Sequence, residues 1–280
     1  APLTIQTDYL EFDPDTYIAT TDRQVAIQRL RDTLYGRGMR VYLKQDRLQL
    51  ESEVRGIFCR SLLIALLCFN SIFTTASAAG ALQVPEADPA ERALPIELDA
   101  AWSELDRRNN RLVFRNLHIT QGSLAISADE ATADPADFEN STWIFTGNVE
   151  IRNAGLQAWC DKAEMSFSNN TLIRTTLRGK PARFTQPRPG GSATEGRGDL
   201  LEYDLRAQTI QMTSNALLSD GTNEITGSNI AYDLGREVVT ASNNGAGQVR
   251  MKITPRPKSS TGQPDKSVPS PANPPAQKVD

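Results

Sequence analysis

Apolar and polar residues alternate through residues 124–151, which hold two strand patterns joined by a polar turn. In the first pattern, apolar residues occupy every second position from Leu124 to Ala128, and in the second they do so from Trp143 to Ile151. A period of two is typical of a β-strand with one buried face. Because similar patterns recur elsewhere, we expect the rest of the chain to consist mostly of further copies of this unit.

In the strong copies of the first pattern, the apolar parity slips by one residue at an aspartate: Asp8, Asp46, Asp129 or Asp161. A one-residue slip turns side chains to the other face of a strand unless the chain bends or bulges there. A bend at the same place in every copy predicts a sheet that folds over on itself. Weaker copies begin at Ile96 and Ile225, and copies of the second pattern cover Thr16–Ile27, Arg111–Ile119, Ser141–Ile151 and Thr209–Leu218. Starts roughly 30–40 residues apart are typical of hairpin repeats.

We expect five segments along the chain. Residues 1–56 form a β fragment, 57–78 an apolar segment, 79–94 a Pro/Ala/Glu linker, 95–254 the main repeat domain and 255–280 a proline-rich tail. The first segment holds at most two repeat units, which is thin for an independent domain because repeats bury their faces against neighbours. The tail carries too few apolar residues to order itself.

The apolar segment is built like a secretory signal peptide. Arg55 and Arg60 precede a short apolar run over residues 62–69, and an A-x-A motif follows at 76–78, so cleavage is expected near Ala78 or Ala79. The run is too short for a membrane span, and the alternative is a buried core helix. A signal belongs at an N-terminus, so either the sequence joins the end of one protein to the precursor of the next, or a fusion uses the segment as an internal anchor. We favour the first.

Composition excludes several classes of function. The 280 residues carry a net charge of −4 with no basic stripe, which argues against nonspecific nucleic-acid binding. The three cysteines, Cys59, Cys68 and Cys160, show no metal-binding spacing with histidine, and Cys160 is expected to be a small buried hydrophobe. The single histidine, His118, lies on the polar parity of its strand without a catalytic partner. We therefore expect no enzyme activity, no metal and no cofactor.

The informative feature is the apolar face of the successive strands. Periodicity alone favours an ordinary packed core, and the functional alternative is a lined apolar groove; the inner volume separates the two. The candidate groove residues are Leu124, Ile126, Phe145, Val149, Ile151, Phe184, Tyr203, Leu205 and Met212.

Four segments of the main repeat domain carry a family resemblance: SLAISAD (123–129), WIFTGNVEI (143–151), GKPARFTQ (179–186) and EGRGDLLEYDL (195–205). With them, residues 95–254 resemble the periplasmic lipopolysaccharide-export bridge proteins of the LptA or OstA-like family. An extra unit over residues 95–122 departs from the shortest members of that family. Residues 1–56, especially LYGRGMRVYLKQDRLQLESEVRG, resemble the C-terminal end of the family's membrane-anchored partner, LptC.

The resemblance implies an all-β fold, a twisted and partly open β jelly roll, whose groove holds the acyl chains of lipid A. It implies a periplasmic carrier without catalysis that stacks head to tail, with an LptC-like inner-membrane anchor and an LptD-like outer-membrane translocon as partners. If the fusion is real, the chain is also associated with the inner membrane. The expected C-terminal stacking edge is residues 246–254, before Pro255. The alternative is a structural, adhesin-like β-solenoid with a packed interior and no lipid.

Overall fold

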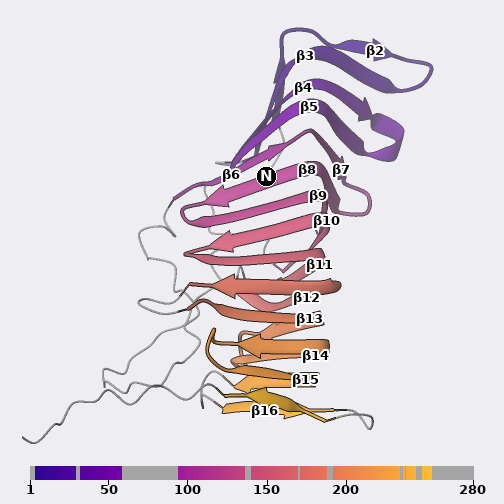
Figure 1. The fold of residues 1–280 in the computed structure, drawn as a ribbon. Helices are drawn as coiled ribbons and strands as arrows, with labels where there is room; N and C mark the ends of the chain where they lie inside the picture. The colour runs from indigo at the N-terminus through magenta and orange to yellow at the C-terminus, as the bar shows by residue number, and fades with distance from the viewer. Residues whose placement is uncertain are drawn as a thin grey trace, which may run out of the picture.

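The protein folds as one twisted antiparallel sheet in the computed structural model (Figure 1). The structure describes residues 4–29, 32–58, 94–135, 140–169, 171–187, 192–233, 236, 238–243 and 248–253. In this part of the chain the sheet has 17 strands, and the only helical element is the short 3-10 turn Leu43–Gln45. The expected all-β fold built from repeated hairpins is confirmed.

The strands follow one another in a meander, stacked like rungs from β3 at one end to β16 at the other (Figure 1). Three rungs are made of two short strands each: β1 and β2 both pair with β3, β6 and β7 with β5 and β8, and β16 and β17 with β15. The bounds are β1 Thr4–Thr7, β2 Glu11–Asp13, β3 Ile18–Arg29, β4 Asp32–Tyr42, β5 Arg47–Phe58, β6 Ile96–Ala100, β7 Trp102–Asp106, β8 Arg111–Gln121, β9 Leu124–Asp134, β10 Thr142–Asn153, β11 Leu156–Ser168, β12 Thr171–Gln186, β13 Thr194–Asp204, β14 Thr209–Ser219, β15 Glu224–Asp233, β16 Val238–Ser242 and β17 Arg250–Lys252.

A line of register shifts crosses the sheet where the parity slip predicts a bend; we call it the corner line. Asp129 in β9 and Asp161 in β11 both lie within shifts of their strand pairs, and Asp8 lies in the break between β1 and β2. In β9 the buried positions run Leu124, Ile126 and Ala128 before the shift, and continue with the other parity afterwards. The bulge therefore keeps apolar side chains on one side of the sheet across the bend.

Left-handed residues and short side-chain hydrogen bonds build the corner line. Gly147 and Asn148 in β10 have φ of 76° and 47°, and the Asn148 amide donates to Asp129 Oδ2 over 2.9 Å. The same arrangement recurs four strands further on, where the amide of Asn215 donates to Asp199 Oδ2 over 2.9 Å. Glycine and asparagine tolerate positive φ better than other residues, which explains the TGNV sequence at this place.

Replacing Gly147 by alanine is expected to lower the free energy of unfolding by about 2–3 kcal/mol, because a positive φ and a steric clash add. A Cβ at this position would lie 2.3 Å from Asp129 Oδ2. Gly155 is the matched control: its φ is 90°, but the nearest atom would lie 3.7 Å from a Cβ. Gly155→Ala should therefore cost only about 1 kcal/mol. Equal losses for both variants in urea denaturation would contradict the clash.

Two predictions from the sequence are wrong: the bend at Asp46 and the start of the apolar segment at residue 57. Asp46 does not bend a strand, because it ends the 3-10 turn with φ 54° between β4 and β5, which pair with each other across it. The apolar segment does not begin at residue 57, because Ile57 and Phe58 complete β5 and pair with Glu97 and Ile96. The inward alternation of Val54 and Gly56 simply continues into the start of that segment.

Strand β5 connects the N-terminal strands with the rest of the sheet. Its second half pairs with β6, for example Val54 with Ala100, and its first half pairs with β7, for example Leu50 with Ser103. Three ion pairs cross this junction: Arg55–Asp99 at 3.4 Å, Arg47–Glu104 at 3.7 Å and Arg107–Asp46 at 3.2 Å. The sheet and its core therefore continue from residues 4–58 into residues 94–253 without interruption.

The apolar run at 62–69, the A-x-A motif, most of the linker and the tail 255–280 lie outside the described residues. Within the described ranges, the structure contains no helix with the length and apolar character that a membrane span requires.

Candidate functional site

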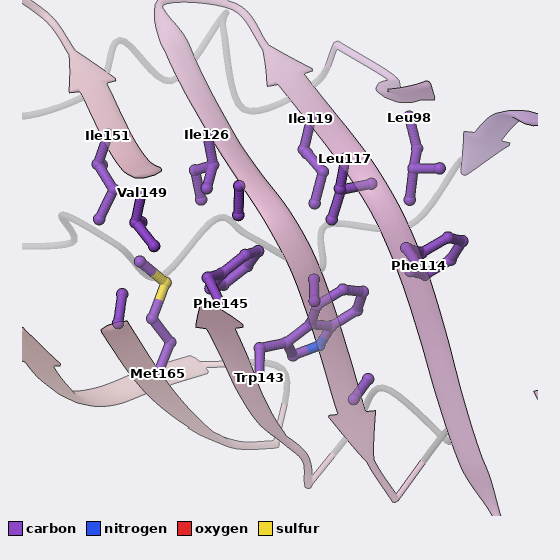
Figure 2. Close-up of a cluster of buried hydrophobic side chains, with 14 of the residues drawn as sticks. Leu98, Phe114, Leu117, Ile119, Ile126, Trp143, Phe145, Val149, Ile151 and Met165 are labelled. Atoms are coloured by element: carbon purple, nitrogen blue, oxygen red, sulfur yellow. The ribbon is translucent and has the colours of Figure 1, made fainter. Parts of the chain in front are cut away.

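The inward face of the folded sheet forms one apolar interior that runs along the stack of strands. Buried side chains from β3 to β15 belong to a single cluster. Part of this cluster surrounds Phe145, where the Trp143 ring stacks on Phe145 at 5.9 Å and on Phe114 at 6.3 Å between ring centroids (Figure 2). Ile126 and Met165 point into the same space from neighbouring strands (Figure 2). Alternation along each strand thus places one continuous apolar lining inside the bend.

The nine predicted groove residues are mostly in this interior. Seven are buried: Leu124, Ile126, Phe145, Val149, Ile151, Phe184 and Met212. Leu205 is partly buried and packs against the cluster. Tyr203, two residues earlier in the chain, is also partly buried. Burial raises the pKa of the Tyr203 hydroxyl above its usual value, so this phenol stays neutral over the physiological range. Their role toward a ligand stays a prediction.

Sequence reasoning left out most of the lining. Phe114, Leu117 and Ile119 of β8, and Trp143 and Met165, are as buried as the predicted residues. The N-terminal strands contribute a further part of the same cluster: Val25, Ile27, Met39, Leu48, Leu50 and Val54. The signal for all of them was present, because they alternate in the same period along their strands.

The corner line divides each bent strand into two halves, which we call its arms. Side chains from both arms pack together in the interior. Phe145, Ile126, Met165, Met212 and Ile230 have no solvent exposure. The long strands β8 to β15 are continuous through the corner line, so their backbone hydrogen bonds join neighbouring strands and not the two arms. Separating the arms at their free ends would therefore break side-chain packing but leave the ladders intact.

The two ends of the inward face differ in chemistry. At one end the buried residues are mostly large and aromatic, with Trp143 on β10, Phe167 on β11 and Tyr232 on β15, and Ser141 adds one buried hydroxyl beside Phe167. At the other end four buried polar residues replace them, and we call this set the polar rim: Gln121, Asn153, Gln186 and Thr194. The Gln121 amide donates to the Leu94 carbonyl over 2.9 Å, and Asn153 Oδ1 accepts from the Ser123 hydroxyl over 3.2 Å.

The remaining reactive side chains do not form a catalytic group in the described structure. Cys160 is free and buried, and burial raises the pKa of its thiol to about 12, which fits the expected small hydrophobe. His118 is exposed, as its parity predicts, and its Nδ1 lies 2.9 Å from the Ser127 hydroxyl. Among the described residues, no cluster of His, Cys, Asp or Glu could hold a metal ion.

Both ends of the stack expose apolar side chains on edge strands. At the N-terminal end these include Ile5 on β1 and Phe12 on β2. At the C-terminal end they include Val239 on β16 and Met251 on β17, with Val249 and Ile253 beside it. An edge strand with apolar side chains is a ready template for pairing with another chain.

Comparison with known proteins gives two matches, one on each side of the junction between β5 and β6. Residues 130–238 match the family described as LptA/(LptD N-terminal domain) LPS transport protein, and residues 1–58 match the family described as lipopolysaccharide-assembly, LptC-related. The chain is LptA-like, with an LptC-related N-terminal part.

Individual protein sequences agree with the first of these matches. The lipopolysaccharide export system protein LptA of Haemophilus influenzae is 26% identical over 162 residues, 52% of this chain and 92% of that protein. The protein LptH of Pseudomonas aeruginosa is 25% identical over 172 residues, 61% of this chain and 79% of that protein. A crystal structure of LptH, described as the LptA-homologous periplasmic component of the lipopolysaccharide transport device, aligns with 22% identity and a TM-score of 0.34, covering 60% of this chain and 100% of that one.

The two matched ranges can be placed on the strands of the sheet. The LptC-related match ends at residue 58, the last residue of β5, and the LptA/(LptD N-terminal domain) match begins at residue 130, within β9. Strands β6, β7 and β8 lie between the two matched ranges, and they join β5 to β9 within one sheet.

Proposed function

We propose that this protein is a non-enzymatic carrier of lipopolysaccharide in the periplasm, with the acyl chains of lipid A held in the apolar interior. One observation carries the proposal: the lining is continuous from the LptC-related range into the LptA-like range, with Val54 of β5 and Phe145 of β10 in the same cluster. Each acyl methylene removed from water contributes about 0.8 kcal/mol, so ten contribute about 8 kcal/mol. A uniform lining of this kind lets an amphiphile move along it with little change in free energy.

Entry of lipid requires the two arms of the sheet to separate. In the described structure, the interior side chains pack against one another and fill the space between the two arms. Opening exposes them, but acyl chains then replace the lost contacts, and the backbone ladders are not broken. The alternative function, a structural β-solenoid whose interior never opens, rests on the same packing, so lipid capture separates the two.

Photo-crosslinking from inside the interior tests carriage directly. A photoreactive phenylalanine analogue at Phe184, which is buried, should capture lipopolysaccharide. The same analogue at Arg183, exposed on the other face where its guanidinium lies 4.9 Å from the Trp159 ring, should not. Capture at neither position would favour the structural alternative, and equal capture at both would contradict the assigned faces.

We further propose that the carrier pairs end to end with an LptC-like anchor, an LptD-like translocon or a second copy. The exposed apolar edges at the two ends support this, because each leaves side chains for a partner strand. Met251→Glu, at a side chain that is 60% exposed, should weaken concentration-dependent association at least tenfold in light scattering, because a charge replaces an apolar contact. Gln248→Glu adds the same charge beside β17 without removing an apolar contact. Unchanged association of the Met251 variant would show that this edge is not used.

A further inference from the structure

The polar rim interrupts an otherwise apolar pattern. On β10 the buried positions after the corner line run Val149, Ile151 and then Asn153, and on β12 they run Ala182, Phe184 and then Gln186. These polar residues keep the inward parity and stay buried. Because neighbouring strands lie about 4.8 Å apart, alternate strands place a polar group about every 10 Å along the rim.

Thr194 is the member of the polar rim whose hydroxyl lacks a hydrogen-bond partner within the described structure. It is 2% exposed, and its hydroxyl has no hydrogen-bond partner in the part of the chain that the structure describes. It lies opposite Gln186, and at the next inward position the Phe184 ring covers Gly196, so closely that a Cβ there would lie 2.1 Å from the ring. Burying an unpaired hydroxyl costs free energy, so the presence of this group in the interior calls for an explanation.

We propose that the polar rim, with Thr194 as its unsatisfied group, is a subsite for the neutral polar groups that join acyl chains to sugar in an acylated sugar lipid. The inference rests on the proposed function, in which the acyl chains occupy the interior. Where a chain meets its head, ester, amide or hydroxyl groups leave water with it and need hydrogen-bond partners. The rim supplies four such side chains, whereas the opposite end offers the aromatic rings of Trp143, Phe167 and Tyr232 and a single buried hydroxyl, that of Ser141.

The chemistry of the rim also selects the part of the head that binds there. All four side chains are neutral, and a buried phosphate would need a cation to offset its loss of hydration. The rim therefore binds hydroxyl, ester and amide groups and leaves phosphates to solvent. The lipid is oriented with its head toward Gln121, Asn153 and Gln186.

Thr194→Val tests the subsite because it should produce two effects of opposite sign. Removing an unpaired buried hydroxyl should raise the melting temperature of the lipid-free protein. Losing one hydrogen bond to the lipid should weaken lipopolysaccharide binding about 3- to 10-fold. Thr194→Ser keeps the hydroxyl and should restore the affinity.

Thr175→Val is the matched control. Thr175 also has a buried hydroxyl without a partner, but it lies on the other side of the corner line, opposite Tyr203 and Met165. This variant should raise the melting temperature and leave the affinity unchanged. An equal loss of affinity in the Thr175 and Thr194 variants would overturn the assignment of the rim.

Three probes separate the possible results: lipopolysaccharide, its dephosphorylated form and a free fatty acid of the same chain length. The Thr194→Val loss should be the same with and without phosphates and absent for the fatty acid. A loss that depends on phosphate, an equal loss for the fatty acid, or no loss for lipopolysaccharide each overturns the subsite. If the wild-type protein binds none of the three probes, the proposed carrier function itself fails, which is a different result from a rim variant that binds like the wild type.

Discussion

Replacing Phe145 by alanine is expected to lower the free energy of unfolding by about 3–5 kcal/mol, the range for deleting a buried aromatic ring. Phe145 has no solvent exposure and stacks on Trp143. It pairs with Ala131 on one side and Ala163 on the other, and these small side chains cannot extend into the space left by the ring. The cavity would therefore persist, and urea denaturation should show a lower midpoint with an unchanged slope.

Phe12→Ala is the control for this experiment. Phe12 is 49% exposed on the edge strand β2 and touches Tyr17 edge to face, with ring centroids 6.3 Å apart. Its loss should change the free energy of unfolding by less than about 1 kcal/mol. A Phe145 variant that lost no more than the Phe12 variant would mean that the interior repacks freely, and the packed lining described above would be wrong.

The period-two alternation was enough to predict the strands and the side of each strand that is buried. It also located the bend, because a parity slip at Asp129 or Asp161 can keep its apolar side chains inside only through a bulge. The same pattern failed at Asp46, since an interrupted ladder can be a bulge or a hairpin turn. Which of the two forms depends on the partner strand, and β5 turns back to pair with β4 there.

Other features depend on contacts that a local pattern does not contain. The polar rim was missed because Gln121 and Asn153 stand next to turns, where polar residues are expected for local reasons. Their inward parity, Ile119 to Gln121 and Ile151 to Asn153, was the available signal. The junction was missed because Phe58 pairs with Ile96, far along the chain and beyond a segment with the pattern of a signal peptide.

The junction leads to the second large effect: Leu50→Asp should separate the two parts of a cleaved chain. A protease site placed within residues 79–93, outside the described residues, would cut the connection between β5 and β6. The wild-type pieces should still elute together, because β5 pairs with β6 and β7 and shares their core. Leu50 has no solvent exposure, so an aspartate there would bury a charge without a partner and cost several kcal/mol.

Two further variants decide how this result is interpreted. Leu98→Asp places the same charge on β6, where the side chain is 3% exposed, so it should separate the pieces from the C-terminal side of the cut even if Leu50→Asp unfolds the N-terminal strands. Arg55→Ala removes only the exposed ion pair with Asp99, which is worth at most about 1 kcal/mol, and its cleaved pieces should stay together. If the wild-type pieces separate on cleavage, the covalent link rather than strand pairing holds the LptC-related strands in place. If they stay together and only the core variants separate, the continuous lining depends on the pairing of β5 with β6 and β7.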